Sequence, residues 1–173
     1  QSSRPRRLRR RRMKPEIVDR VLYSYRIGDP AGKYPIYDDE GARLFSGRWN
    51  TTNSPMLYSS EHYSTAMLEK LAHFNGVLPG NQHYIRITIP LGISYEEFQP
   101  AAHSGWDGID DSISKAFGAK WHLERRSCLL IVPSLPGGRI ERNFLINLRH
   151  PDAGKITHDM ATPVPWDARL FQI

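Results

Sequence analysis

The sequence has a single cysteine, Cys128, among its 173 residues. It also has no apolar run close to the roughly 20 residues that a membrane-spanning helix needs. One thiol can form no internal disulfide and no thiolate cluster around a metal, and a chain of this length can bury enough apolar surface to fold without either. We therefore expect one soluble domain in a reducing cytoplasm, with no role at a membrane and with Cys128 buried in the core.

Common cofactor and catalytic motifs are missing as well. No Gly-rich loop of the P-loop or dinucleotide-binding form lies between a strand and a helix, and no nucleophile-elbow sequence supports a hydrolase triad. His62, Glu69 and His73 share a predicted helix, but their spacing is not that of a zinc-protease helix. We expect solvated or capping roles for the two histidines, and neither a metal site nor a bound prosthetic group.

The net charge of +6 is concentrated at one end of the chain. Seven of the 24 basic residues are arginines within residues 1–12, which contain no acid, so residues 13–173 carry 17 basic and 18 acidic residues. We expect residues 1–12 to be disordered, because their like charges repel and they lack apolar periodicity. This tail is either a basic arm for RNA, DNA or an acidic partner, or a vector-derived or upstream-translation remnant ahead of a start at Met13. We favour the remnant.

In residues 13–173, helix patterns are interspersed with strands of both the alternating and the fully buried type, which predicts a single α+β domain rather than a doubly wound sheet. The predicted elements are a strand over 21–27, a long loop over 28–41, a helix capped by Ser59 or Ser60 and running to about Phe74, a strand over 83–89, a short helix reaching Trp121, and a buried strand over 127–132.

The helix that ends near Phe74 has an apolar stripe formed by Tyr63, Met67, Leu71 and Phe74, which we expect to pack on the core. Glu69 lies about 160 degrees from the centre of this stripe, at about 100 degrees per residue. Periodicity alone therefore predicts a solvated Glu69.

Four residues suggest a chemistry. Arg26 lies on the first strand, Arg48 is flanked by Gly47 and Trp49, Tyr58 ends a short apolar run, and Glu69 lies on a helix. Arginines bind phosphates through a fixed fork of donors, an aromatic ring packs on a flat ring, and a carboxylate stabilises a sugar cation.

Several short segments, in this order, resemble the RES domain, the toxin half of RES-Xre toxin–antitoxin pairs. They are Tyr25-Arg26, Gly41-Ala42-Arg43, Gly47-Arg48-Trp49-Asn50, Leu57-Tyr58-Ser59-Ser60, Ala66-Met67-Leu68-Glu69, Gly118-Ala119-Lys120-Trp121, Ser127 through Val132-Pro133-Ser134, Glu141-Arg142-Asn143 with Asn147, and His150-Pro151. The resemblance runs from about Tyr25 to Leu170. Leu148 departs from it, since the family usually has proline there, which affects a local turn and leaves the active site untouched.

The resemblance implies a fold like that of ADP-ribosyltransferases, with a mixed sheet and flanking helices. It implies cleavage of the nicotinamide–ribose bond of NAD+, used as a substrate, by phosphorolysis, by hydrolysis or by transfer of ADP-ribose to a protein target. It further implies neutralisation by an Xre-type antitoxin, with nucleic acid involved only through that partner.

The same resemblance assigns roles to residues. Glu69 and Arg26 are the expected catalytic residues, and Arg26, Arg48, Tyr58 and Ser127 the expected NAD+-binding residues, with Ser127 orienting a polar group or Glu69. Gly47, Trp49 and Asn50 are expected to support the loop that presents Arg48.

Structural alternatives compete with these roles. Arg48 and Trp49 could stack on the surface, Tyr58 could be a core residue, Ser127 could cap a strand end, and Asn50 could form an Asx-turn. Two other functional classes also stay open: a nucleic-acid-binding or nuclease toxin that uses the basic arm, and an interaction module without catalytic activity. The near-neutral body argues against the first of these.

Overall fold

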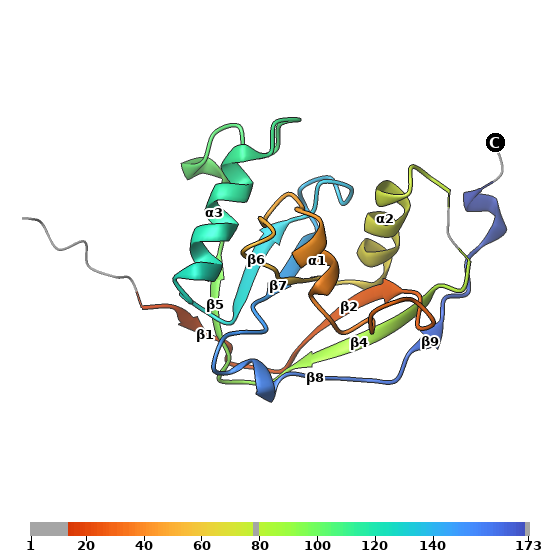
Figure 1. Cartoon of the computed structure of the whole chain (residues 1–173), viewed down its shortest axis with the longest axis horizontal. Coiled ribbons are helices and arrows are strands. Elements are labelled where there is room, and N and C mark those ends of the chain that lie inside the picture. The colour runs from red at the N-terminus through yellow and green to blue at the C-terminus, as the bar shows by residue number, and fades with distance from the viewer. Residues whose placement is uncertain (1–13, 78–79, 172–173) are drawn as a thin grey trace, which may run out of the picture.

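The computed structural model describes residues 14–77 and 80–171 (Figure 1). Its strands are β1 Glu16–Ile17, β2 Leu22–Gly28, β3 Leu57–Ser60, β4 His83–Ile89, β5 Ser94–Glu97, β6 Leu129–Pro133, β7 Arg142–Ile146, β8 Thr157–His158 and β9 Thr162–Pro163. Its α-helices are α1 Glu40–Leu44, α2 Tyr63–His73 and α3 Ser112–Leu123, and its 3-10 helices are η1 Pro100–Ala102, η2 Ala153–Lys155 and η3 Ala168–Leu170. The predicted disordered tail over 1–12 lies outside the described residues.

The described strands form one mixed sheet in the order β1-β5-β6-β7-β3-β2-β4-β8, and β9 also pairs with β4. Only β5 and β6 run parallel among these pairs. The β2–β4 ladder joins all seven residues of each strand, whereas β2 and β3 meet at a single register pair, Tyr25 with Ser60. The sheet is therefore continuous on one side of β2 and opens on the other side, beyond Tyr25.

The strands alternate their side chains between two cores. Ile87, Leu129 and Phe144 belong to one core, which is closed by Ala153 and Ile156 from the C-terminal segment. The second core lies on the α3 side and contains the residues Trp49, Met56, Phe98, Trp106, Trp121, Leu130, Val132 and Leu145. Figure 1 shows α1, α2 and α3 on the same upper side of the strands.

Most of the predicted elements are confirmed. The strand over 83–89 is β4, the strand over 21–27 is β2 shifted by one residue, and the helix reaching Trp121 is α3. The buried strand begins two residues later than predicted, at Leu129. Cys128 is fully buried as expected, and burial raises the pKa of its thiol to about 12. None of the described helices combines the length and the apolar content that crossing a bilayer requires.

The predicted start of the helix that runs to about Phe74 was wrong. Ser59 and Ser60 belong to β3, where the Ser59 hydroxyl donates to the Phe144 carbonyl at 2.8 Å, and α2 begins at Tyr63. The apolar stripe is only partly correct, because Tyr63 and Met67 pack against an apolar cluster whereas Phe74 is exposed. The α2 residues that are buried are Thr65 and Ala66, which lie on the side of the helix that carries Glu69 and away from the predicted stripe.

Candidate functional site

Arg26 lies at the place where the sheet opens. Its Nε donates to the Ile36 carbonyl at 2.7 Å, and one terminal guanidinium nitrogen donates to the Tyr58 carbonyl at 2.8 Å. The side chain thus spans from β2 to β3 beyond the last register pair, and it also fixes the loop that follows β2. Burial lowers the pKa of Arg26 from its usual value, with opposing contributions from Asp38, Tyr58 and Asp39. Both hydrogen bonds go to neutral carbonyls, so they orient the guanidinium without neutralising it.

Glu69 is half-buried and held from the opposite side of the sheet opening. Its Oε1 accepts hydrogen bonds from the Ser134 hydroxyl at 2.7 Å and from the Asn143 side-chain amide at 2.6 Å. Within the described ranges, no hydrogen bond is made to Oε2. The carboxylate is therefore fixed by one oxygen and leaves the other available to a ligand.

Tyr58 accepts from Arg26 through its carbonyl, while its side chain reaches the 47–50 loop. Burial raises the pKa of its hydroxyl above the usual value. The hydroxyl donates to Asn50 Oδ1 at 2.7 Å and accepts from the Trp49 amide at 3.1 Å. The ring is thereby locked to the 47–50 loop.

The 47–50 loop is built around Asn50, which is fully buried. Asn50 Oδ1 accepts from the Gly47 amide at 2.9 Å, and its side-chain amide donates to the carbonyls of Ala42 and Thr51, each at 2.9 Å. A Cβ on Gly47 would lie 2.7 Å from the Tyr58 hydroxyl, so this position has room only for glycine. These contacts fix the backbone on both sides of Arg48.

Arg48 is turned toward the segment before α3. One of its terminal guanidinium nitrogens donates to the carbonyls of Trp106 and Gly108, each at 3.0 Å. Trp49 does not stack on it; the indole is buried, with its ring centroid 4.8 Å from that of Phe98 and 5.9 Å from that of Trp106. Arg48 therefore holds the loop over 106–108 and lies on the α3 side of Tyr58.

A cleft of about 190 Å³ opens beside Arg26. Its lining residues include Arg26, Tyr34, Ile36, Asp38 and Lys70, together with Asp29 and Gly41. Lys70, which lines the cleft, directly follows Glu69 on α2. Arg26 and Lys70 thus line one cleft, Tyr58 is joined to Arg26 through its carbonyl, and Glu69 precedes Lys70 on α2.

The chain was compared with known families and proteins. A model of the RES domain matches residues 24–167. The chain belongs to the RES domain family. Over 155 residues it is 33% identical to the Prs ADP-ribosylating toxin of Sphingobium sp. (strain YBL2), a match that covers 86% of this chain and 96% of that protein. A chain of the M. tuberculosis MbcT–MbcA toxin–antitoxin complex has a similar fold, with a TM-score of 0.65 at 18% identity over 86% of each chain.

One predicted site residue of this RES domain has a different position from the one expected. Ser127 is fully buried; its hydroxyl accepts from the Trp121 indole at 2.7 Å and donates to the Leu129 carbonyl at 2.8 Å. Both contacts are internal, so Ser127 does not orient Glu69 and has no surface for a ligand. Ser134 makes that contact instead. The sequence offered a signal for it, because Val132-Pro133-Ser134 lies in the block that resembles the family.

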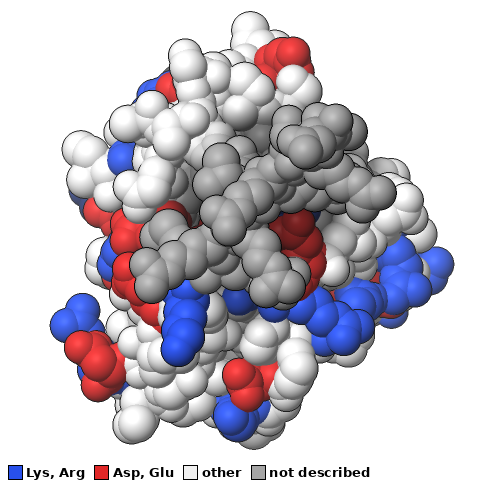
Figure 2. Space-filling model, turned by 90° about the vertical axis from the view of Figure 1, so that its left-hand side faces the viewer, with Lys and Arg blue, Asp and Glu red and all other residues white. Residues whose placement is uncertain are grey.

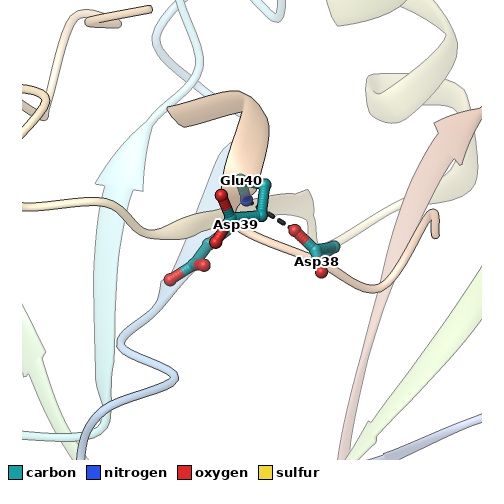
Figure 3. Close-up of side chains that lie close together, drawn as sticks. All are labelled: Asp38, Asp39 and Glu40. Atoms are coloured by element: carbon teal, nitrogen blue, oxygen red, sulfur yellow. Dashed lines mark hydrogen bonds between the residues drawn. The ribbon is translucent and has the colours of Figure 1, made fainter. Parts of the chain in front are cut away.

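An acidic segment of the RES domain was not predicted to be of interest. Asp38, Asp39 and Glu40 place carboxylate oxygens within 4.8 Å of one another at the start of α1 (Figure 3). Each carboxylate has a partner of its own: Asp38 accepts from the Glu40 amide at 2.5 Å, Asp39 pairs with Arg149 at 2.7 Å and Glu40 pairs with Arg43 at 3.2 Å. These contacts explain the cluster as an anchor for α1, where acidic groups are stabilised by the helix N-terminus.

Proposed function

We propose that this RES domain is a toxin that breaks the nicotinamide–ribose bond of NAD+, with Glu69 and Arg26 as its catalytic residues. The observation that carries the proposal is the Glu69 carboxylate, fixed through one oxygen and open at the other, on a helix whose next residue, Lys70, lines a cleft together with Arg26. The relative named as an ADP-ribosylating toxin supports the proposal, because ADP-ribosylation takes ADP-ribose from NAD+.

Glu69 would act on the charge that develops in the reaction. When neutral nicotinamide leaves, positive charge appears on the ribose, and a preorganised anion next to that carbon lowers the barrier. Ser134 and Asn143 hold Oε1 in place, so little reorganisation is needed when the charge forms. Oε2 is then the oxygen that faces the ribose or one of its hydroxyls.

The other residues would position the dinucleotide. Arg26 would hold the pyrophosphate or a ribose hydroxyl with the guanidinium donors that the carbonyls of Ile36 and Tyr58 leave free. Tyr58 would pack on the nicotinamide or its ribose, and Arg48 would bind substrate at the α3 side of the opening. No metal takes part in this scheme, and NAD+ is consumed as a substrate rather than held as a prosthetic group.

The proposal is tested by incubating the purified protein with NAD+ and measuring released nicotinamide with and without inorganic phosphate. Three acceptors are chemically possible, and each gives its own product: phosphate gives a phosphorylated ADP-ribose, water gives free ADP-ribose, and a protein target gives a modified protein. No nicotinamide release under any of these conditions would contradict the proposal and favour an interaction module without activity.

Two serines provide a matched pair of variants within one motif block. Ser134→Ala should lower nicotinamide release several-fold, because it removes one of two contacts that orient Glu69, and it should also cost some stability, because the buried hydroxyl accepts from the Gly137 amide. Ser127→Ala should lower the free energy of unfolding by about 1–3 kcal/mol, because it leaves the buried Trp121 indole without its partner. Nicotinamide-release assays and thermal melts of both variants test this prediction. A loss of release in Ser127→Ala together with unchanged release in Ser134→Ala would contradict the geometry assigned to Glu69.

We further propose an Xre-type antitoxin as the partner, because an enzyme that depletes NAD+ poisons its own cell, and a cytoplasmic location, where NAD+ is available. A carboxylate or C-terminus of the antitoxin could occupy the cleft and pair with Arg26 or Arg48 as a pyrophosphate does. We then expect a non-hydrolysable NAD+ analogue to weaken antitoxin binding in calorimetric titrations. Unchanged antitoxin affinity at a saturating analogue concentration would exclude occlusion of the cleft.

The alternative of a nucleic-acid-binding toxin has less support. Residues 13–173 carry one more acidic than basic residue, and among the described residues visible in Figure 2, acidic side chains lie beside basic ones on much of the face. A basic band is confined to the lower right of that view. Nucleic-acid binding usually draws on a clustered basic surface that neutralises several phosphates.

A further inference from the structure

We propose that Lys70 is a positioning residue of the cleft, whose ammonium binds, together with Arg26, a phosphoryl group of the substrates. This inference rests on the proposed NAD+-consuming function and adds to it a residue that neither the motifs nor the comparisons assign. Two sources of the phosphoryl group are possible, the pyrophosphate of NAD+ and an inorganic phosphate acceptor.

The position of Lys70 in the fold gives the first argument. It is half-buried on α2, directly after Glu69, and it lines the same cleft as Arg26. A lysine next to a catalytic glutamate on a helix points about 100 degrees away from it, which lets the two residues contact different parts of one extended ligand. Glu69 would meet the ribose while Lys70 meets a group further along the dinucleotide.

The lack of a counterion gives the second argument. Among residues 14–77 and 80–171, no carboxylate forms an ion pair with either Lys70 or Arg26, and no group accepts a hydrogen bond from Lys70 Nζ. Its close contact is the Phe74 ring, whose centroid lies 5.3 Å from Nζ and which stabilises a cation without neutralising it. Two cations that line one cleft without an ion-pair partner form a site for an anion.

The other charged and titratable groups of the cleft do not remove this charge. Asp29 Oδ1 accepts from the Ala31 amide and the Asn81 side chain, both at 2.8 Å, and Asp38 Oδ1 accepts from the Glu40 amide. Tyr34 is the remaining titratable residue in the lining. Asp38 Oδ1 is thus turned to a backbone donor of its own loop and Asp29 Oδ1 to Ala31 and Asn81, while Arg26 and Lys70 keep free donors.

Burial, followed by the repulsion from Arg26, lowers the pKa of Lys70 to about 8. The ammonium is therefore mostly charged at pH 7 and loses its proton as the pH rises through about 8. Binding of a phosphoryl group should follow the same direction, strong below pH 8 and weaker above it. Arginine at this position keeps its charge over the whole range and removes this dependence.

The test uses ADP-ribose and inorganic phosphate as separate probes of the full-length protein in calorimetric titrations. Lys70→Met keeps the apolar stem that packs in the cleft and removes the charge, Lys70→Arg keeps the charge, and Lys120→Met serves as the control, because Lys120 is exposed on α3. At pH 7 we expect Lys70→Met to weaken binding roughly tenfold to a hundredfold, as the loss of a charge-assisted contact does. Lys70→Arg and Lys120→Met should bind nearly as the wild type.

The two probes separate the two sources. A loss confined to ADP-ribose assigns Lys70 to the pyrophosphate of NAD+, and a loss confined to inorganic phosphate assigns it to the acceptor. Between pH 7 and pH 9 the affinity of the wild type for the affected probe, expressed relative to that of Lys70→Arg at the same pH, should fall toward that of Lys70→Met. Equal binding by Lys70→Met and the wild type, or no binding of either probe by the wild type, would overturn the proposal.

The binding test separates a failure of the phosphoryl site from a failure of the proposed catalysis. Binding of ADP-ribose that depends on Lys70 in a protein that releases no nicotinamide would support the phosphoryl site and contradict the proposed catalysis. If Lys70→Met releases nicotinamide with the wild-type KM for NAD+ and binds both probes as the wild type does, the catalysis is supported and Lys70 is removed from the site.

Discussion

Glu69→Gln is expected to lower nicotinamide release from NAD+ by a factor on the order of 100 or more, which corresponds to about 3 kcal/mol of transition-state stabilisation. The substitution removes a negative charge next to the carbon that becomes positive. It preserves the shape of the side chain and an Oε1 that can still accept from Ser134 and Asn143. The fold should therefore survive while the chemistry is lost.

The measurement is a nicotinamide-release assay together with a thermal melt and an ADP-ribose titration of the same variant. We expect a melting temperature close to that of the wild type and ADP-ribose binding that is largely retained, because the pyrophosphate contacts lie elsewhere in the cleft. Glu124→Gln is the matched control: Glu124 is an exposed glutamate at the end of α3, and its loss should leave turnover unchanged. Near-normal turnover by folded Glu69→Gln would exclude Glu69 as the catalytic anion.

The sequence predicted the parts of this site that depend on local pattern. Alternation placed Arg26 on a strand, and helical periodicity placed Glu69 on a helix, because both patterns report on neighbours within one element. Periodicity alone nevertheless predicted a solvated Glu69, and it is half-buried. Its burial comes from Ser134 and Asn143, which lie 65 and 74 residues away along the chain, so no periodicity within the helix could reveal it.

Long-range contacts also explain why Ser127 was predicted to orient Glu69 where Ser134 does so. Ser127 and Ser134 bracket one strand, and both occur in the block that resembles the family, but the sequence does not say which of them meets α2. Ser127 lies before β6, where the chain leaves α3 and Trp121 is within reach. Ser134 lies after Pro133, at the end of β6 that approaches Asn143 and α2. Register between β6 and β7, which is a long-range property, decides the outcome.

The opening between β2 and β3 was also beyond prediction. A strand pattern indicates that residues alternate between faces and does not show where two neighbouring strands separate. The contact from Arg26 to the Tyr58 carbonyl is what reveals the opening, and it joins residues 32 positions apart. The proposal for Lys70 likewise depends on long-range contacts, since nothing in its local sequence distinguishes it from a solvated helical lysine.

Gly118→Ala is expected to be the most destabilising single substitution considered, with a loss of about 3 kcal/mol or more in the free energy of unfolding. A Cβ at this position in α3 would lie 1.9 Å from the Trp49 carbonyl oxygen and 2.9 Å from its carbonyl carbon. Alanine normally stabilises a helix by about 1 kcal/mol over glycine, so the intrinsic preference has the opposite sign and is overcome by the clash.

The clash cannot be relieved cheaply, because the backbone on the other side is itself fixed. Trp49 is buried against Phe98 and Trp106, and the next residue, Asn50, is held by Gly47, Ala42, Thr51 and Tyr58. Either α3 moves away from the sheet or the 47–50 loop shifts. Movement of the loop would displace Tyr58 and Arg48, so we expect turnover per folded molecule to fall as well.

Thermal melts of Gly118→Ala and of Gly154→Ala make the comparison. Gly154 lies in η2, is exposed, and has no atom within 4 Å of its would-be Cβ, so its substitution should leave the melting temperature nearly unchanged. A loss of about 3 kcal/mol in a domain of this size lowers the melting temperature by roughly 6–12 °C. A Gly118→Ala protein that melts with the wild type would show that α3 does not pack directly on the Trp49 carbonyl. The position of the 47–50 loop, and with it that of Tyr58, would then need another support.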